Sequence, residues 1–193
     1  GEKNEADRQR LLHDLEQLLV HMDWLIEALL KMAKLDAGTV SMKKETVKVS
    51  DLLKKSIQDF LIPMELREQN LVVDCADKIS LSGDEYWLRE AVGNIVKNCM
   101  EHTPAGGEIC LQAVENHLYT EITVSDNGAG IDKEDLPHIF ERFYKGKNSS
   151  GSSVGIGLAL ARMIVVAQEG SLSATNGANG GARFEIRFYK GTV

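Results

Sequence analysis

The first forty residues contain one long amphipathic pattern. Apolar side chains recur at alternating spacings of four and three residues, which places them on one face of a helix: Leu11, Leu15, Leu18, Met22, Leu25, Leu29 and Met32. A second row repeats every seven residues beside the first: Leu12, Leu19, Ile26 and Ala33. No Pro or Gly interrupts residues 2–37, so the pattern predicts a single helix that ends near Gly38. Such a regular stripe favours a helical bundle or a dimer seam over a terminal helix packed on its own domain.

Beyond residue 40 the pattern changes to short apolar runs and alternating positions between turn residues. These predict strands at 46–49, 70–75, 79–84, 107–116, 118–128, 170–176 and 181–189. Helical spacing predicts helices at 51–68, from a cap at Asp84 to about 103, and at 155–168. Residues 127–154 show little apolar period. The fold class is therefore α+β: a mostly antiparallel sheet with helices on one face.

Composition narrows the function classes. With 43% apolar and 26% charged residues among 193, the chain is globular. A net charge of −7 argues against an extended nucleic-acid surface, although a small anion could bind beside local positive groups or a cation. Cys75, Cys99 and Cys110 lie in apolar runs without metal-ligand spacing, which indicates reduced, buried thiols in a reducing compartment. No apolar run approaches the roughly 18 residues of a membrane span. Because the first residue is Gly and no signal peptide follows, we expect a piece of a longer protein.

Four clusters of candidate chemistry follow one another within about seventy residues. Asn94 and Asn98 share a helix face, which Glu101 and His102 extend by one turn. The other three clusters are "DNGAGI" (126–131), "IFERFYKG" (139–146) and "SSVGIGLALAR" (152–162). Each alone has an ordinary explanation, since surface amides, turns and glycine packing are common. Their order in one stretch makes them informative.

This order resembles the ATP-binding catalytic domain of bacterial sensor histidine kinases, within the gyrase, histidine-kinase and MutL ATPase superfamily. Residues 94–103 resemble the N box, Asp126–Gly130 the G1 box, Phe140 and Phe143 the F box, and Gly155 and Gly157 the G2 box. The resemblance covers residues 43–190. It implies a two-layer α/β sandwich of the Bergerat type over 43–193, with a lid at about 137–155. The segment "LIEALLKMAKLDAG" (25–38) resembles the second helix of the dimerisation and phosphotransfer hairpin, so residues 1–38 are expected to be part of it.

The resemblance also implies roles for single residues. Asn98 should bind Mg²⁺, and Asn94 should hold phosphate or the water shell of the ion. Asp126 should accept a hydrogen bond from the adenine amino group, and Arg142 or Lys145 should meet the γ-phosphate. His102 either contacts the nucleoside or is a half-buried helix histidine. The implied catalytic set is Asn94, Asn98, Arg142 and Lys145. The implied nucleotide-binding set is Asn98, His102, Asp126, Gly128, Gly130, Ile131, Phe140, Gly155, Ile156, Gly157 and Leu158.

Some positions depart from the family pattern. Ser153 and Val154 stand where another glycine pair is frequent, and Glu101 stands where a Lys is frequent. Hydrolytic relatives have a Glu as general base one helical turn before the metal-binding Asn; Asn94 cannot take a proton there. The sequence thus favours phosphotransfer from ATP to a histidine. A superfamily ATP hydrolase and a nucleotide-binding module without turnover remain the alternatives.

The segment "KNSSGSS" (147–153) is expected to belong to a mobile lid that closes on the γ-phosphate, or to be a loose loop. No histidine fits the acceptor position. His13 is followed by Asp14, as an acceptor would be, but no Pro follows before Pro63 and the heptad leaves no room for a turn. His13 is more simply a solvated surface residue. The expected partners are ATP or ADP, the missing hairpin and a response regulator, but no nucleic acid. The expected parent is a homodimer with this part cytoplasmic and an inner-membrane anchor elsewhere.

Overall fold

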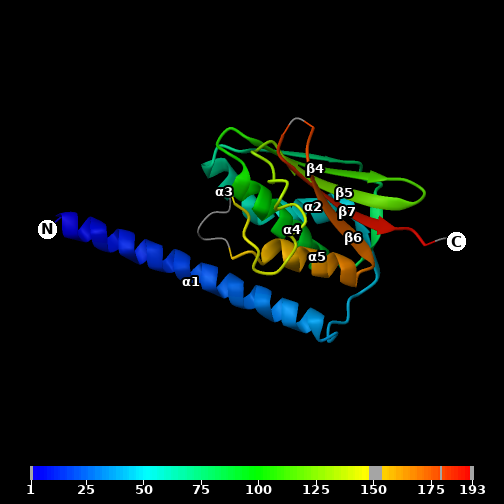
Figure 1. Cartoon of the computed structure of the whole chain (residues 1–193), viewed down its shortest axis with the longest axis horizontal. Helices are drawn as coiled ribbons and strands as arrows, with labels where there is room; N and C mark the ends of the chain where they lie inside the picture. The colour runs from blue at the N-terminus through cyan, green and yellow to red at the C-terminus, as the bar shows by residue number, and fades with distance from the viewer. Residues whose placement is uncertain (1, 148–153, 179, 192–193) are drawn as a thin grey trace. The chain divides into compact units, whose positions relative to one another are not determined.

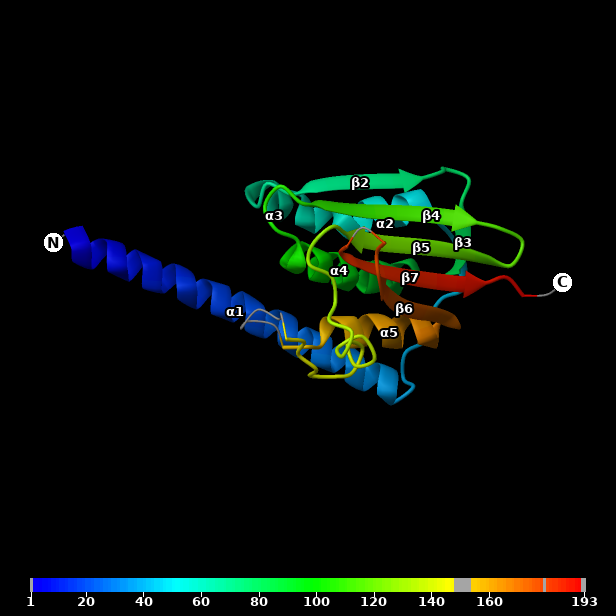
Figure 2. The ribbon, with the colours of Figure 1, turned by 45° about the horizontal axis from the view of Figure 1, so that its top comes forward.

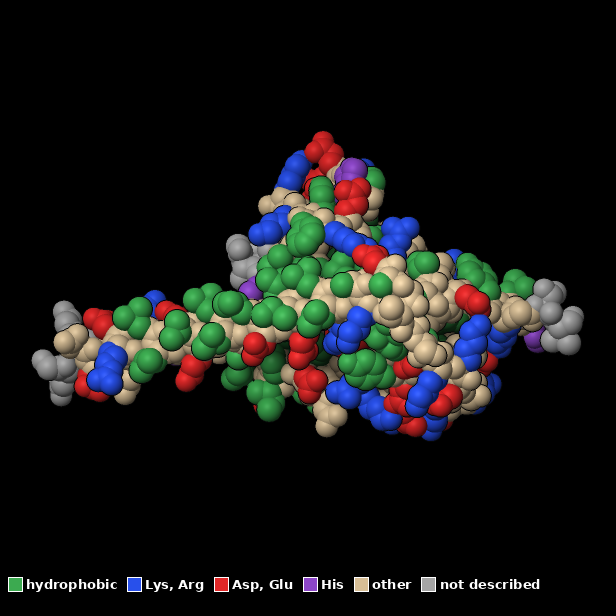
Figure 3. Space-filling view, turned by 90° about the horizontal axis from the view of Figure 1, so that it is seen from below, with side chains coloured by type: hydrophobic (Ala, Val, Ile, Leu, Met, Phe, Trp, Pro, Cys, Tyr) green, Lys and Arg blue, Asp and Glu red, His purple; other side chains and the backbone are tan. Residues whose placement is uncertain are grey.

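The long N-terminal helix is present as predicted. The computed structural model describes residues 2–147, 154–178 and 180–191, and it divides into two compact units, Gly1–Val40 and Ser41–Val193. Helix α1 spans Glu2–Asp36 without interruption (Figure 1). Gly38 ends it with a φ of +64° and an N–H that donates to the Leu35 carbonyl over 3.1 Å. Apolar side chains of the heptad are exposed along α1 (Figure 3), among them Leu11, Leu15, Leu18 and Met22. The assignment of residues 1–38 to a phosphotransfer hairpin stays a prediction.

The second unit is built on a five-stranded sheet in the order β2-β4-β5-β7-β6. The strands are β2 Asn70–Cys75, β4 Glu108–Glu115, β5 Tyr119–Asp126, β6 Gly170–Asn176 and β7 Ala182–Tyr189. Only the β2–β4 pair is parallel, so the prediction of a mostly antiparallel sheet is confirmed. Strands β1 Glu45–Lys48 and β3 Ser80–Gly83 form a separate antiparallel pair. Asn116 closes the predicted β4–β5 turn by accepting the Leu118 and Tyr119 N–H groups.

Helices cover one face of this sheet (Figure 2). They are α2 Val49–Ile57, the 3₁₀ turn η1 Gln58–Phe60, α3 Leu61–Leu66, α4 Glu85–His102 and α5 Gly157–Ala167. The core between the two layers consists of fully buried apolar side chains, including Leu52, Ile95, Ile122, Leu160 and Phe184. The predicted two-layer α/β sandwich with a long N-terminal helix is therefore confirmed. Within the described part of the chain, no helix combines the length and apolar character that crossing a membrane would need.

Two helix predictions were wrong in detail. The single helix predicted at 51–68 is broken into α2, η1 and α3. Pro63 explains the break, because it has no N–H to donate back to the carbonyl at Asp59 and its ring crowds that carbonyl. Helix α5 begins at Gly157 rather than at Gly155. Gly155 has a φ of +76°, which no helical residue adopts.

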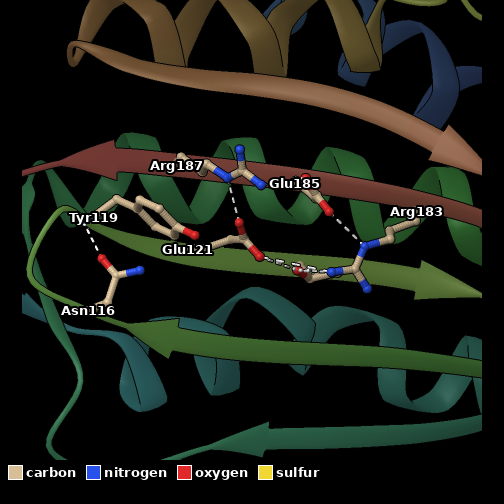
Figure 4. A network of polar contacts seen from close by, with 7 residues as sticks. Asn116, Tyr119, Glu121, Arg183, Glu185 and Arg187 are labelled. Carbon is tan, nitrogen blue, oxygen red and sulfur yellow. Dashed lines mark hydrogen bonds and ion pairs between the residues drawn. The ribbon is translucent and has the colours of Figure 1, made fainter.

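On the opposite face of the sheet, β5 and β7 carry charged side chains that form ion pairs with one another. Glu121 on β5 is 7% exposed and accepts from Arg187 on β7 over 2.5 Å (Figure 4). Glu185 joins Arg183 and Arg187 at 2.8 and 3.0 Å. The hydrogen bond that the Arg187 guanidinium donates to Glu121 is the main reason that the pKa of Arg187 is raised above its ordinary value. The opposite charges on these two neighbouring strands thus neutralise one another.

Candidate nucleotide-binding site

Helix α4 presents the two asparagines of the predicted site on one face. Its N-terminus is capped by Asp84, whose carboxylate accepts the Trp87 N–H. Asn94 is buried, and its amide N–H donates to the Glu90 carbonyl over 2.9 Å. Its amide oxygen, Oδ1, faces Gly157: a Cβ added to Gly157 would lie 3.1 Å from this oxygen. Asn94 therefore packs against the first residue of α5.

Asn98 lies one helical turn further along α4 and is half-buried. Its side-chain amide makes no hydrogen bond with any residue that the structure describes. An amide oxygen left without a protein donor suits a hard cation such as Mg²⁺, which prefers oxygen ligands. No group of three or more His, Cys, Asp or Glu side chains in the described segments is placed to hold a metal ion. The donor chemistry at Asn98 fits one ligand of a Mg²⁺ that also binds phosphate and water.

Asp126 at the end of β5 has one satisfied and one unsatisfied oxygen. The side chain is 8% exposed. Oδ1 accepts the N–H groups of Gly128 and Ala182, at 2.9 and 3.2 Å. Oδ2 is buried and has no hydrogen-bond partner among the described residues. An unpaired buried polar atom costs about 1–3 kcal/mol. The geometry therefore presents an acceptor that a ligand with an N–H group would satisfy.

Cys99 lies close to this carboxylate, which sequence reasoning did not anticipate. The thiol is fully buried on α4. Burial, and next the charge of Asp126, raise its pKa well above the ordinary value, so it stays a neutral thiol. Cys75 and Cys110 are free and only half-buried, so the prediction of buried thiols holds for Cys99 alone.

The glycines after β5 are required by the protein itself. A Cβ on Gly128 would lie 2.5 Å from the His102 carbonyl oxygen at the end of α4. Gly130 has a φ of +77°, and a Cβ there would lie 2.9 Å from Asn176 Oδ1. Both glycines belong to the nucleotide-binding set that the family resemblance implies, which is one cause for a residue without a side chain at these positions. The structure adds a second cause, because the loop packs against α4 and the β6–β7 hairpin. His102 itself is exposed, so the half-buried alternative for it was wrong.

Two residues that hold this loop were missed at the sequence level. Asn176 accepts the Ile131 N–H and donates to the Ile131 carbonyl, both at 2.7 Å. Gly181 has a φ of +76°, and a Cβ there would lie 1.8 Å from the Asp126 carbonyl oxygen. Both belong to "TNGANGGA" (175–182), a sequence that by itself indicates only a turn. These contacts join residues about fifty positions apart in the sequence, so no local sequence pattern indicates them.

The two F-box phenylalanines have different surroundings. Phe140 is half-buried: its ring meets that of Phe184 edge to face at 6.5 Å, and the Arg162 guanidinium lies 5.3 Å from its centroid. Phe143 is 59% exposed, with a φ of +64°. Phe140 therefore already has aromatic and cationic partners inside its own unit, whereas the ring of Phe143 is largely exposed.

At the expected phosphate side of the site, the F-box segment contacts Gly155, two residues before α5. The Phe143 N–H donates to the Gly155 carbonyl over 2.8 Å, and a Cβ on Gly155 would lie 2.2 Å from the Tyr144 carbonyl oxygen. The F-box segment and the start of α5 are thus joined. Ile156 is fully buried, whereas Leu158 is half-buried.

The two candidate cations differ in their surroundings. Arg142 is exposed and its guanidinium lies 3.4 Å from Met163 Sδ. Lys145 is exposed, and its ammonium makes no hydrogen bond or ion pair with a described residue. Residues 148–153 of the expected lid, with Ser153, lie outside the described residues.

Comparisons with known proteins agree with this geometry. The family described as "Histidine kinase-, DNA gyrase B-, and HSP90-like ATPase" matches residues 83–192, more than half of the chain. Heme sensor protein HssS of Staphylococcus saprophyticus is 27% identical over 188 residues, covering 97% of this chain and 40% of that protein. Sensor histidine kinase CusS of Escherichia coli K12 is 28% identical over 187 residues, covering 95% and 38%.

A solved structure shares the fold. Acinetobacter baumannii histidine kinase AdeS superposes with a TM-score of 0.75 at 19% identity, covering 91% of this chain and 81% of that one. The chain spans about 40% of the length of the curated relatives it matches. The chain belongs to the histidine kinase-, DNA gyrase B- and HSP90-like ATPase family.

Proposed function

We propose that this chain is the ATP-binding catalytic core of a two-component sensor histidine kinase. It would transfer the γ-phosphoryl group of Mg-ATP to a histidine that lies outside the chain. The observation that supports this most directly is the buried Oδ2 of Asp126, which has no hydrogen-bond partner among the described residues. A carboxylate oxygen can only accept hydrogen bonds. Adenine presents an amino group at C6, whereas guanine presents a carbonyl there, so this acceptor favours ATP over GTP.

The phosphate end of the site is supported by groups that already lie near one another. Gly157 begins α5 beside Asn94, and the N–H groups of a helix N-terminus stabilise phosphate. Asn98 would supply one oxygen ligand to Mg²⁺, which neutralises phosphate charge. Lys145, whose ammonium pairs with none of the described residues, would meet the γ-phosphate, and Arg142 is the second candidate cation of this segment.

Asn94 supports transfer rather than hydrolysis. Water needs a general base to become a good nucleophile, and the amide of Asn94 cannot serve as one. A neutral imidazole is already nucleophilic near pH 7, so a histidine acceptor needs only positioning and charge neutralisation from this domain. The named relatives, a heme sensor protein and sensor histidine kinases, favour the same choice.

The acceptor histidine would come from another part of the parent protein. His13 is exposed on α1, as expected of a solvated surface residue. We propose that the acceptor lies on the first helix of the hairpin whose second helix is α1. The phosphoryl group would pass from there to a response regulator. Two copies of the parent would associate through the apolar seam of α1.

The proposed adenine contact is tested with the Asp126→Asn variant. Its affinity for Mg-ATP is measured by calorimetric titration and compared with that of the parent chain. The amide replaces an acceptor with a group that also donates, so ATP affinity should fall by about 1–3 kcal/mol. Asp77→Asn is the matched control, because Asp77 is an exposed aspartate that only pairs with Lys48. The control should bind as the parent does. Unchanged ATP affinity in Asp126→Asn would show that Asp126 is not the adenine acceptor.

A further inference from the structure

The segment that follows the G1 box folds back around one buried carboxylate. Asp135 is only 6% exposed although it lies outside every helix and strand. Its Oδ1 accepts the phenolic O–H of Tyr144 over 2.7 Å. Its Oδ2 accepts the backbone N–H of Lys147 over 2.9 Å. Both oxygens are therefore used, and one side chain holds two points of the chain nine and twelve residues further on.

These two points lie on either side of Lys145. Between them, Gly146 passes so close to the carboxylate that a Cβ would lie 2.7 Å from Asp135 Oδ2. The hydrogen bond from Tyr144, and then the one from the Lys147 N–H, hold the pKa of Asp135 below its ordinary value. The same bond raises the pKa of Tyr144. At neutral pH the carboxylate is thus charged and the phenol protonated, which is the state that forms the hydrogen bond.

The other side of this short segment is fixed as well. The Phe143 N–H donates to the Gly155 carbonyl, and Gly155 lies against the Tyr144 carbonyl. Residues 143–147 are therefore attached to the start of α5 at one end and to Asp135 at both ends of the Lys145–Gly146 pair. Lys145 itself is exposed, and its side chain makes no hydrogen bond or ion pair with the residues that the structure describes.

We infer that Asp135 is a positioning residue for the γ-phosphate: it fixes the backbone on both sides of Lys145, so that the ammonium stands beside the start of α5. The inference rests on the proposed function, in which the phosphates lie at that helix N-terminus. An ordered lysine loses less side-chain and backbone freedom on meeting the phosphate than one on an untethered loop. Asp135 acts through Lys145 and touches neither nucleotide nor acceptor.

The test compares ATP with ADP, because only ATP has the γ-phosphate. For Asp135→Ala we expect Mg-ATP affinity to fall about tenfold while ADP affinity stays within about twofold. Lys145→Ala should give the same selective loss. The double variant should lose no more than either single one, since removing Lys145 leaves Asp135 nothing to position. Glu134→Ala is the matched control: its carboxylate pairs with the Lys147 side chain at the surface but does not hold the backbone. It should bind both nucleotides as the parent does.

Three results would overturn the inference. Equal losses for ATP and ADP would mean that Asp135 only stabilises the fold, and additive losses in the double variant would mean that it does not act through Lys145. If Asp135→Ala does not fold, Tyr144→Phe removes one hydroxyl, and its unchanged ATP-to-ADP affinity ratio would count equally against the inference. A parent chain that binds neither nucleotide would overturn the proposed function itself, and this inference with it.

Discussion

At the scale of single residues, Asp126 combines two jobs in one carboxylate. Oδ1 fixes the loop that follows β5 through the Gly128 and Ala182 N–H groups, and Oδ2, which no described residue satisfies, is the acceptor that we propose for adenine. The motif at 126–130 was enough to predict Asp126 as an acceptor. It could not reveal that the β6–β7 hairpin also donates to Asp126, because that contact joins residues 56 apart.

Gly181 should be as important to this arrangement as the glycines of the motif. We expect Gly181→Ala to destabilise the fold by at least about 1–3 kcal/mol, because its backbone has a φ of +76° and its Cβ would overlap the Asp126 carbonyl. The measurement is denaturant unfolding. Gly191→Ala is the control, since a Cβ there meets nothing within 4 Å. If the two variants were equally stable, the close approach of Gly181 to β5 would be incorrect.

At the scale of elements, the candidate site is formed by α4, the loop after β5, and the start of α5. Apolar periodicity predicted α4 and α5 because their buried faces repeat with helical spacing. It missed the break at Pro63 because the apolar residues on both sides of the proline keep a helical pattern. It also missed the role of Asn176, since a turn sequence between two strands carries no record of the distant loop that it holds.

The contribution of this hairpin can be measured at Asn176. We expect Asn176→Ala to lose two hydrogen bonds to Ile131, each worth about 0.5–1.5 kcal/mol, and to weaken ATP binding by loosening the loop. Hydrogen exchange at the Ile131 amide should become faster. Asn116→Ala provides the comparison, because it also loses two backbone hydrogen bonds, but in the β4–β5 turn. Both variants should be less stable, and only Asn176→Ala should bind ATP more weakly. Equal ATP affinity in the two would contradict the role of Asn176.

At the scale of the whole molecule, the chain consists of a helix with an exposed apolar seam and a compact α/β unit. The order of the four sequence clusters was sufficient to predict the family, since their spacing reflects one fold. The contacts among the clusters could not be predicted in this way. Asp135 is an example: sequence shows only an acidic residue in a polar segment, and its burial depends on how Tyr144 and Lys147 return to it.

In the function proposed for this unit, the γ-phosphoryl group of ATP passes to a histidine outside the chain. The most direct measurement is incubation with Mg²⁺ and γ-labelled ATP, first of the chain alone and then together with a separate hairpin that contains an acceptor histidine. We predict no acid-labile label on the chain alone, and label on the hairpin when both are present. Label should disappear with Asn98→Ala, which removes the proposed metal ligand. Stoichiometric labelling of the chain alone that His13→Ala abolishes would contradict the account.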